Sequence, residues 1–447
     1  MIAQHLYMMA FEHHRAGRLK EAEAVYRAAL RHDPRLSGAL CNLGILSHRA
    51  GDEETALDYL RRALDSDPHS ALALSNMGVV LKSLGRLEES LSAQSQAEKM
   101  NPDSPAIHHN LGTIYRALSR LEEAESSFKR ALALKPDFVD AEFGLANLKL
   151  AQGDFESGFE LYECRWNLEE GRKARRSFNA PRWNGESLDG KTLLIHAEQG
   201  FGDTIQFIRL ATLLREGKVI FEGQKALLPL LRGVGGIDEL VAAGEPLPHF
   251  DYHLPLLSLP NVMKLKVEEI PAEIPYVRSE PGLVAAWGRR LGPRRGRRVG
   301  LVWRGSPGHV NDSERSMDPS LLSPLLDLEE TELIGLQKDP KPGDLEQLPG
   351  VRNLGPELAD FGDTAAVLAH MDITLSVCTS VLHLAGALGR KSIGLLPYVA
   401  DWRWLLSRED SPWYPSIQLI RQRRPGDWPE VVDRAVETIR EHQPQQF

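Results

Sequence analysis

A period of 34 residues organises the first part of this 447-residue chain. Prolines recur at that spacing, at Pro34, Pro68, Pro102 and Pro136. A second series with the same spacing consists of four glycines and one serine: Gly17, Gly51, Gly85, Ser119 and Gly153. Proline ends a helix, because it has no N–H to donate and clashes with the preceding turn. Glycine marks tight turns, since it adopts positive φ without strain. The two series therefore predict a stack of helix–turn–helix units.

The period and the unit are those of tetratricopeptide repeats. One such unit cannot bury its apolar face alone, so neighbouring units stack into a solenoid. Solenoids of this kind present an extended concave surface for binding. We therefore expect an α-solenoid that binds a protein, and chemistry in the rest of the chain that acts on a protein.

An asparagine ladder runs through the repeats, at Asn42, Asn76 and Asn110. A side-chain amide both donates and accepts hydrogen bonds, so a row of amides can hold the backbone of an extended peptide. The alternative is that asparagine is simply common at this position. The ladder resembles the one in the superhelix of eukaryotic O-linked N-acetylglucosamine transferases, and we expect it to bind the acceptor.

Net charge and cysteine content exclude some classes of partner and of site. The net charge of −9 argues against nucleic acid as a partner, because phosphate backbones are bound by basic faces. The three cysteines are odd in number and far apart, which fits a reducing cytosol and neither a disulfide framework nor a zinc cluster. No apolar run approaches the roughly 18 residues of a membrane span, and the N-terminus does not read as a signal peptide. We expect a cytoplasmic protein with no membrane span and no metal.

From about Phe178 the repeat pattern gives way to short apolar runs that alternate with helical stretches. The runs predict strands at Thr192–His196, Val219–Phe221, Phe250–Leu254, Val299–Trp303, Glu332–Leu336, Ile373–Val377 and Ser392–Leu396. Six arginines within 289–298 indicate an exposed crossover between domains, with phosphate binding as the alternative. Strand–helix alternation on both sides predicts two doubly wound parallel sheets. Ligands of such sheets lie beyond the carboxyl ends of the strands.

The segment Gly200-Phe201-Gly202-Asp203 follows the first of these strands and precedes a helix predicted from Thr204. Its glycines allow the backbone to approach a ligand closely. Asp203 could accept a proton from an attacking hydroxyl. The alternative is that Asp203 only caps the helix.

Two further loops follow strands of the second sheet. The loop from Trp303 to Ser316 carries three cationic side chains, Arg304, His309 and Arg315, which suit a diphosphate. Thr379 and Ser380 begin a helix, whose N-terminal amides also favour phosphate. The segment Asp401–Trp404 follows the next strand and could form a wall of the same crevice.

Residues 185–192 match the expression for a phosphate-binding P-loop, but the match is spurious. A P-loop follows a strand and opens a helix, whereas this segment runs into the strand Thr192–His196. It gives no support for ATP hydrolysis.

Four segments together resemble bacterial tetratricopeptide glycosyltransferases with a heptosyltransferase-like catalytic half: EQGFGDTIQFIR, VGLVWRGSPGHVNDSERSM, SVCTSVLHLAGALGRKSIGLLP and DWRWLLSREDSPWYPS. The resemblance covers most of residues 182–430. It implies a GT-B fold of two Rossmann-like domains and metal-independent, inverting transfer from a nucleotide sugar, with no other cofactor. It also implies that the final helix, from about Pro429, crosses back toward the first of these domains.

The resemblance assigns roles residue by residue. Asp203 is implied as the catalytic base, and Thr379, Ser380 and His383 as phosphate ligands. Relatives usually carry an aspartate that touches the donor sugar where this chain has Cys378. The donor-binding set that we predict is Gly200, Gly202, Arg304, Ser306, His309, Asn311, Arg315, Gln337, Lys338, Cys378, Thr379, Ser380 and His383.

The predicted architecture is therefore α plus α/β. It comprises a repeat solenoid over 1–168, an acceptor-side Rossmann-like domain over 169–284 and a donor-side Rossmann-like domain over 285–447. We expect a glycosyltransferase whose repeats present an acceptor protein, such as flagellin or another surface protein. Two alternatives stay open: a non-catalytic repeat adaptor with a degenerate transferase half, and a transferase acting on lipopolysaccharide.

Overall fold

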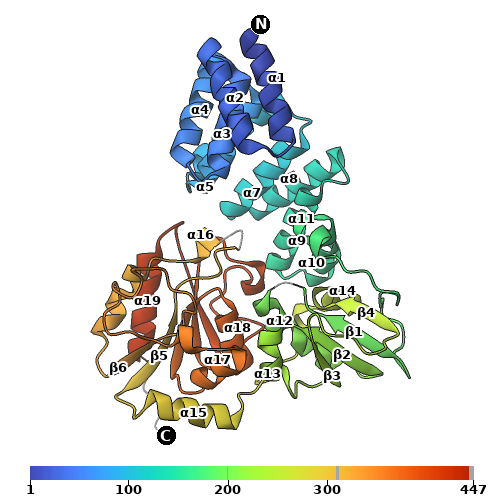
Figure 1. Ribbon diagram of the computed structural model, residues 1–447, viewed down its shortest axis with the longest axis vertical. Coiled ribbons are helices and arrows are strands. Elements are labelled where there is room, and N and C mark those ends of the chain that lie inside the picture. Colours follow the sequence, from blue (N-terminus) through green and yellow to red (C-terminus); the bar gives the residue numbers. More distant parts are fainter. Residues whose placement is uncertain (199, 309–311, 442–447) are drawn as a thin grey trace. The chain divides into compact units, whose positions relative to one another are not determined.

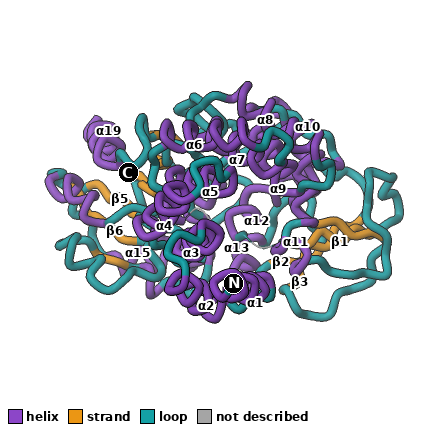
Figure 2. Tube along the Cα trace, turned by 90° about the horizontal axis from the view of Figure 1, so that it is seen from above, coloured by secondary structure: helices purple, strands orange, loops and turns teal. Residues whose placement is uncertain are grey.

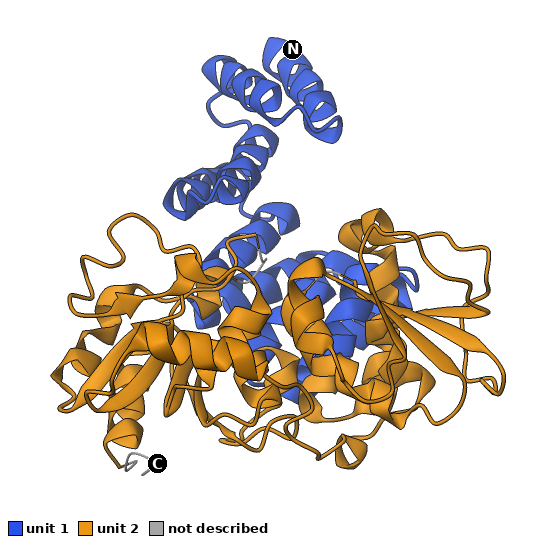
Figure 3. Cartoon of the chain, turned by 60° about the horizontal axis from the view of Figure 1, so that its bottom comes forward, with its two compact units in different colours: residues 1–148 blue, residues 149–447 orange. Residues whose placement is uncertain are grey.

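A computed structural model describes residues 1–198, 200–308 and 312–441 of the chain. The chain divides into two compact units, residues 1–148 and 149–447 (Figure 3). No helix of the described residues is long and apolar enough to cross a membrane. The predicted three-domain division, with boundaries at 168 and 284, stays a prediction.

The first unit is built from helix pairs, as the period predicts (Figure 1). The helices are α1 (Ile2–Arg15), α2 (Leu19–His32), α3 (Ser37–Arg49), α4 (Glu53–Ser66), α5 (Ala71–Ser83), α6 (Leu87–Met100), α7 (Pro105–Ala117) and α8 (Leu121–Leu134). A further helix, α9 (Val139–Gln152), continues the series across the boundary between the units. Each odd-numbered helix from α1 to α7 packs on the helix that follows it. The helical repeat architecture is thereby confirmed.

The turn inside each repeat uses one backbone conformation. Gly17, Gly51, Gly85 and Gly153 have φ of 73°, 80°, 72° and 85°. Ser119 occupies the same place in its repeat with φ 57°. A residue with a side chain is strained by about 1–2 kcal/mol in this left-handed region, so Ser119 is a weak point of the solenoid.

Replacing Ser119 by glycine should therefore stabilise the first unit. The relief of strain outweighs the extra chain entropy of glycine, which costs about 0.5–1 kcal/mol. We expect a net gain of up to ~1 kcal/mol in the free energy of unfolding of the isolated repeats, measured by urea denaturation. The matched control is Ser119→Ala, which keeps the strain. A glycine variant no more stable than the alanine variant would contradict this account.

The second unit begins with α10 (Phe155–Tyr162) and α11 (Glu169–Ala174), which precede a four-stranded parallel sheet. The strands are β1 (Thr192–His196), β2 (Lys218–Gly223), β3 (Glu239–Ala242) and β4 (Tyr252–Pro255). Their order is β3-β2-β1-β4. The helix α12 (Phe201–Phe207) follows β1, and two short helices, α13 (Leu228–Leu231) and α14 (Leu259–Val262), follow β2 and β4.

The second sheet has six parallel strands and lies apart from the first (Figure 2). They are β5 (Arg297–Val302), β6 (Thr331–Gly335), β7 (Arg352–Asn353), β8 (Ile373–Val377), β9 (Ser392–Leu396) and β10 (Ile417–Arg421). Their order, β10-β9-β8-β5-β6-β7, is the Rossmann order 3-2-1-4-5-6 with β5 as strand 1. The associated helices are α15 (Pro281–Leu291), α16 (Asp312–Arg315), α17 (Phe361–Leu368), α18 (Ser380–Ala387) and α19 (Trp428–Glu441). The expectation of parallel sheets alternating with helices is confirmed.

One expectation about this unit is wrong, and another holds only in part. The final helix α19 does not cross to the first sheet, because its apolar side, including Val432 and Val436, belongs to the core of the second sheet with Val299 and Leu375. The arginine-rich segment 289–298 is exposed at Arg289, Arg290, Arg294 and Arg295, as expected, but not along its whole length. It ends α15 and begins β5, and Arg298 is buried with its Nε 2.6 Å from a Glu332 oxygen.

Candidate active site

The second sheet brings two of the predicted loops together at its topological switch point. β5 and β8 are neighbours, while the strands that follow them run to opposite sides of the sheet. A crevice forms beyond the carboxyl ends of such a strand pair. Arg315, in the loop after β5, donates from Nη1 to the carbonyl of Cys378, after β8, over 3.2 Å. The predicted contributions of these loops therefore meet in one place.

The start of α18 lies at this switch point. Thr379 is the N-cap residue and has extended backbone, and Ser380 opens the helix. The Thr379 hydroxyl lies 3.1 Å from the hydroxyl of Ser376, which is the penultimate residue of β8. Free amides and the helix dipole make such an N-terminus favourable for a phosphate group.

The first sheet contributes Asp203 through α12. The helix begins at Phe201, three residues earlier than predicted, and its N-cap is Gly200. Asp203 therefore lies inside the first turn and makes no side-chain cap bond, so the capping interpretation is wrong. Its Oδ1 accepts a hydrogen bond from Arg403 Nη2 over 2.8 Å. The carboxylate is 28% exposed, so solvent and ligands reach it.

Gly202, in the first turn of α12, lets this helix lie close to α18. A Cβ added at this position would lie 2.9 Å from Cδ2 of His383 on α18. A Cβ at Gly200 would lie 2.6 Å from Oδ2 of Asp203. Both glycines thus give clearance, one between α12 and α18 and the other beside the carboxylate.

Arg403 lies in the segment Asp401–Trp404 that was expected to form a wall of the crevice, but it was not among the predicted site residues. It is 8% exposed, and its Nη1 and Nη2 each lie 2.8 Å from a carboxylate oxygen, of Asp401 and Asp203 respectively. Its guanidinium also lies over the Trp402 ring, 4.3 Å from the centroid. Burial opposes the charge, but the carboxylates of Asp401 and Asp203 hold the pKa of Arg403 well above its ordinary value. The only signal in the sequence was an arginine between two tryptophans after a strand.

Cys378 and His383 are buried and uncharged at neutral pH. Burial and the nearby charge of Asp401 raise the pKa of the Cys378 thiol to about 11. Trp404 donates from Nε1 to the Cys378 sulfur over 3.1 Å. Burial lowers the pKa of His383 to about 3, and its ring stacks on Trp404 with centroids 5.1 Å apart. A protonated thiol is a poor nucleophile, so neither group has the character of a covalent catalyst.

Of the remaining donor-binding predictions, Arg304 and Gln337 hold the loop after β5. Arg304 Nη2 lies 3.1 Å from a carboxylate oxygen of Asp344, and the Arg304 backbone N–H donates to Gln337 Oε1 over 3.1 Å. Lys338 donates to the carbonyl of Leu358. Ser306 is exposed. His309 and Asn311 lie outside the described residues.

The backbone after Arg403 is strained and tied down. Leu405 has φ 51°, a left-handed conformation for a residue with a side chain. Arg421 on β10 donates from Nη2 to the carbonyls of Trp404 and Leu405 over 2.9 and 3.0 Å. Strain of this kind persists only where the surroundings enforce it, and it concentrates at functional sites.

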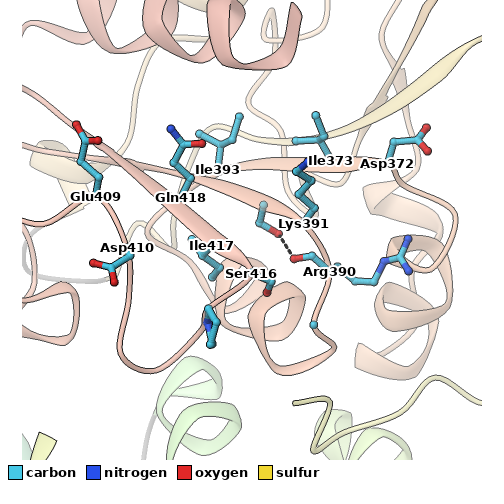
Figure 4. Close-up of a pocket in the computed structure, with 13 residues that line it drawn as sticks. Asp372, Ile373, Arg390, Lys391, Ile393, Glu409, Asp410, Ser416, Ile417 and Gln418 are labelled. Atoms are coloured by element: carbon cyan, nitrogen blue, oxygen red, sulfur yellow. Dashed lines mark hydrogen bonds between the residues drawn. The ribbon is translucent and has the colours of Figure 1, made fainter. Parts of the chain in front are cut away.

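A hollow of about 400 Å³ lies elsewhere on the second sheet (Figure 4). It is lined by Ile373, Ser392 and Ile417, which are the first residues of β8, β9 and β10. Glu409 and Asp410 lie on one side of it and Arg390 on the other. Parallel sheets bind their ligands at the carboxyl ends of strands, so this hollow at the amino ends is not part of the candidate site.

In the first unit, the asparagine ladder bonds between repeats. Asn76 Nδ2 donates to the Cys41 sulfur over 3.2 Å, and Asn110 Nδ2 donates to the Ser75 hydroxyl over 3.1 Å. Asn42 is buried, whereas Asn76 and Asn110 are partly exposed. The amides of Asn76 and Asn110 therefore serve the stacking of the repeats and also offer surface to a partner.

Replacing Asn42, Asn76 and Asn110 together by alanine should weaken the binding of an acceptor protein, because the partly exposed amides of Asn76 and Asn110 no longer bond to its backbone. Nucleotide affinity should stay unchanged. Titration calorimetry measures both, with Asn101→Ala, at the exposed end of α6, as the control. Circular dichroism checks the helices, since each lost inter-repeat bond costs about 1 kcal/mol. An unchanged affinity for the acceptor would show that the asparagine ladder does not bind it.

Tetratricopeptide repeat models match residues 7–71 and 69–137, which confirms the predicted repeats over these residues. Protein FlbA of Caulobacter vibrioides is 26% identical over 334 residues, which are 67% of this chain and 55% of that protein. The chain thus spans little more than half of this relative.

Solved structures with similarity to the chain include a thermophilic tetratricopeptide protein of Thermus thermophilus. It shares 24% identity and a TM-score of 0.35 over 37% of this chain and 91% of its own. A second is Pseudomonas aeruginosa pilF, with 20% identity and a TM-score of 0.34 over 40% of this chain and 78% of its own.

Proposed function

We propose that this protein is a glycosyltransferase with a GT-B catalytic part, which moves a sugar from a nucleotide donor to a hydroxyl of an acceptor protein. The observation that carries the proposal is the convergence of Asp203 with the switch point of the second sheet. Arg403 links Asp203 to Asp401 on the loop after β9, and Gly202 lies against His383 on α18. A carboxylate from one sheet thus faces a phosphate-suited crevice of the other.

The second sheet would hold the donor. Its diphosphate fits the amides at the start of α18 and the guanidinium of Arg315, which already reaches the carbonyl of Cys378. Charge builds on the diphosphate as the bond to the sugar breaks. Preorganised cations and amides stabilise that charge, and this is usually the largest catalytic contribution.

Asp203 would act as the general base. As the acceptor hydroxyl attacks the anomeric carbon, its proton passes to the carboxylate, and the nucleoside diphosphate leaves with the electron pair of the broken bond. Attack opposite to the leaving group inverts the anomeric centre. Arg403 binds only Oδ1, and among the described residues no hydrogen bond is made to Oδ2, which leaves this oxygen for the hydroxyl.

The repeats would bind the acceptor protein, such as flagellin or another surface protein, and the reaction would take place in the cytoplasm. The match to tetratricopeptide repeats supports a protein partner. The same match favours a second candidate, a repeat adaptor whose α/β part binds a nucleotide without transferring sugar.

A thermal-shift screen of nucleoside mono- and diphosphates on the purified protein tests the proposal. A ligand present at 100 times its Kd stabilises the folded state by about 2.7 kcal/mol. The proposed enzyme should be stabilised by at least one diphosphate and less by the corresponding monophosphate. Stabilisation without sugar transfer to any acceptor would favour the adaptor, and no stabilisation by any nucleotide would overturn both.

Arg315→Ala should weaken binding of the diphosphate found in that screen. The loss of one charge-assisted hydrogen bond costs about 1.5–3 kcal/mol, which is roughly a ten- to 150-fold rise in Kd. Arg408→Ala is the matched control, because Arg408 pairs with Asp410, which lines the hollow at the amino ends of the strands and not the candidate site. If the Arg315→Ala variant binds the nucleotide with the same Kd as the control variant, the diphosphate does not bind at Arg315.

A further inference from the structure

We propose that Asp401 binds the hydroxyl groups of the transferred sugar, and that Arg403 is the positioning residue that fixes Asp401 and Asp203 toward the same site. The inference rests on the proposed function and deepens it. It assigns a specificity-determining residue and a substrate class, a nucleotide sugar with free ring hydroxyls. Neither residue belonged to the predicted donor-binding set.

The geometry of Arg403 divides the two carboxylates into two roles. Nη2 bonds Oδ1 of Asp203, on α12 of the first sheet, and Nη1 bonds Oδ1 of Asp401, after β9 of the second sheet. The two aspartates are 198 positions apart in the chain (401 − 203). One guanidinium with its donors in a fixed fork thus sets the orientation of a carboxylate on each side of the crevice.

Asp401 is held on one oxygen and open on the other. Its Oδ1 accepts from the backbone N–H of Arg403 over 3.0 Å and from Nη1 over 2.8 Å. Among the described residues, no hydrogen bond is made to Oδ2, and the side chain is 34% exposed. An ionised carboxylate is an acceptor-only group with room for several donors. The open oxygen therefore suits a ligand that brings O–H donors.

The position of Asp401 indicates which part of the donor it would contact. Trp404, in the same short segment, donates from Nε1 to the sulfur of Cys378, at the carboxyl end of β8, and its ring stacks on His383 of α18. A second anion is a poor partner for the diphosphate itself, which the α18 N-terminus and Arg315 suit better. The group beside the diphosphate is the sugar, and its hydroxyls are the donors that a fixed carboxylate binds.

A comparison of nucleotides with and without the sugar tests this role. Titration calorimetry would measure the Kd of UDP, UDP-glucose, GDP and GDP-mannose for wild type and for Asp401→Asn. The ratio of the Kd of the nucleoside diphosphate to the Kd of the matching nucleotide sugar measures the contribution of the sugar contacts, separately from that of the diphosphate. The matched control is Asp410→Asn, which neutralises an exposed carboxylate that lines the hollow at the amino ends of β8, β9 and β10, away from the candidate site.

We expect Asp401→Asn to bind the nucleoside diphosphate within about twofold of wild type and the matching nucleotide sugar about tenfold more weakly, the scale of one charge-assisted hydrogen bond. Asp401→Glu keeps the negative charge but moves the carboxylate oxygens, so the sugar should no longer increase the affinity of the nucleotide for this variant. Asp401→Glu also replaces the asparagine variant in the test if that variant does not fold. Arg403→Lys should retain part of the transfer rate that Arg403→Gln loses, since lysine keeps a cation between the carboxylates.

The outcomes separate the two proposals. A wild-type protein that binds none of the four nucleotides, and no other nucleoside diphosphate in the thermal-shift screen, overturns the proposed function and this inference together. A wild type that binds nucleotide sugars, with the same gain from the sugar in both Asp401 variants, overturns this inference alone. Equal weakening of diphosphate and nucleotide sugar would also overturn it, because Asp401 would then only hold the loop.

Discussion

Asp203→Asn is expected to lower the rate of sugar transfer by about 10²–10⁴-fold, the usual contribution of general base catalysis. Asparagine keeps the size of the side chain and an oxygen that accepts from Arg403, so the first turn of α12 should survive. The amide cannot take the proton of the attacking hydroxyl. Steady-state transfer with a nucleotide-sugar donor measures the effect as a loss in kcat.

Donor affinity provides the internal control for this variant. The diphosphate site lies on the second sheet, so the Kd for the nucleoside diphosphate should barely change. Asp189→Asn, an exposed aspartate before β1, controls for the loss of one negative charge on the first sheet. If Asp203→Asn transfers sugar as fast as wild type, Asp203 is not the base, and its bond to Arg403 is structural.

Phe159→Ala is expected to destabilise the second unit by about 3–5 kcal/mol, the cost of removing a large aromatic side chain from a core. Phe159 on α10 is 1% exposed, and its ring lies 5.5 Å from Trp402 and 6.1 Å from Phe207 between centroids. It thus packs against both α12 and the segment that carries Arg403. The loss should also disturb the placement of Arg403 over Trp402.

Tryptophan fluorescence during urea denaturation measures this effect on the second unit alone. All eight tryptophans of the chain lie after residue 148. Leu406→Ala, which truncates a side chain 37% exposed, is the control and should cost less than about 1 kcal/mol. A Phe159 variant as stable as that control would show that α10 is not part of the core of the second unit.

The sequence predicted the buried strands and missed strands at sheet edges. β1, β8 and β9 have the predicted bounds, because strands covered on both faces read as continuous apolar runs. The strands that were missed, β3, β7 and β10, each end a sheet. Two of them expose polar side chains such as Arg352 and Gln418, which weakens the apolar signal.

The candidate site was predicted as separate loops and not as a set of contacts. Gly202, Asp203, Thr379 and Arg315 were found because each stands between a strand and a helix or in a loop with glycines. The pairing of Asp203 with Arg403 joins positions 200 residues apart, and no local pattern encodes such a contact. For the same reason, the burial of Arg298 was not predicted, because its partner Glu332 lies on the neighbouring strand β6.

A crystal structure with a bound nucleoside diphosphate tests the central claim most directly. The account predicts the diphosphate within hydrogen-bond distance of Arg315 and of the backbone amides at Thr379 and Ser380, with Asp203 facing the position of the sugar. A nucleotide bound on the first sheet, or in the hollow at the amino ends of β8, β9 and β10, would contradict it.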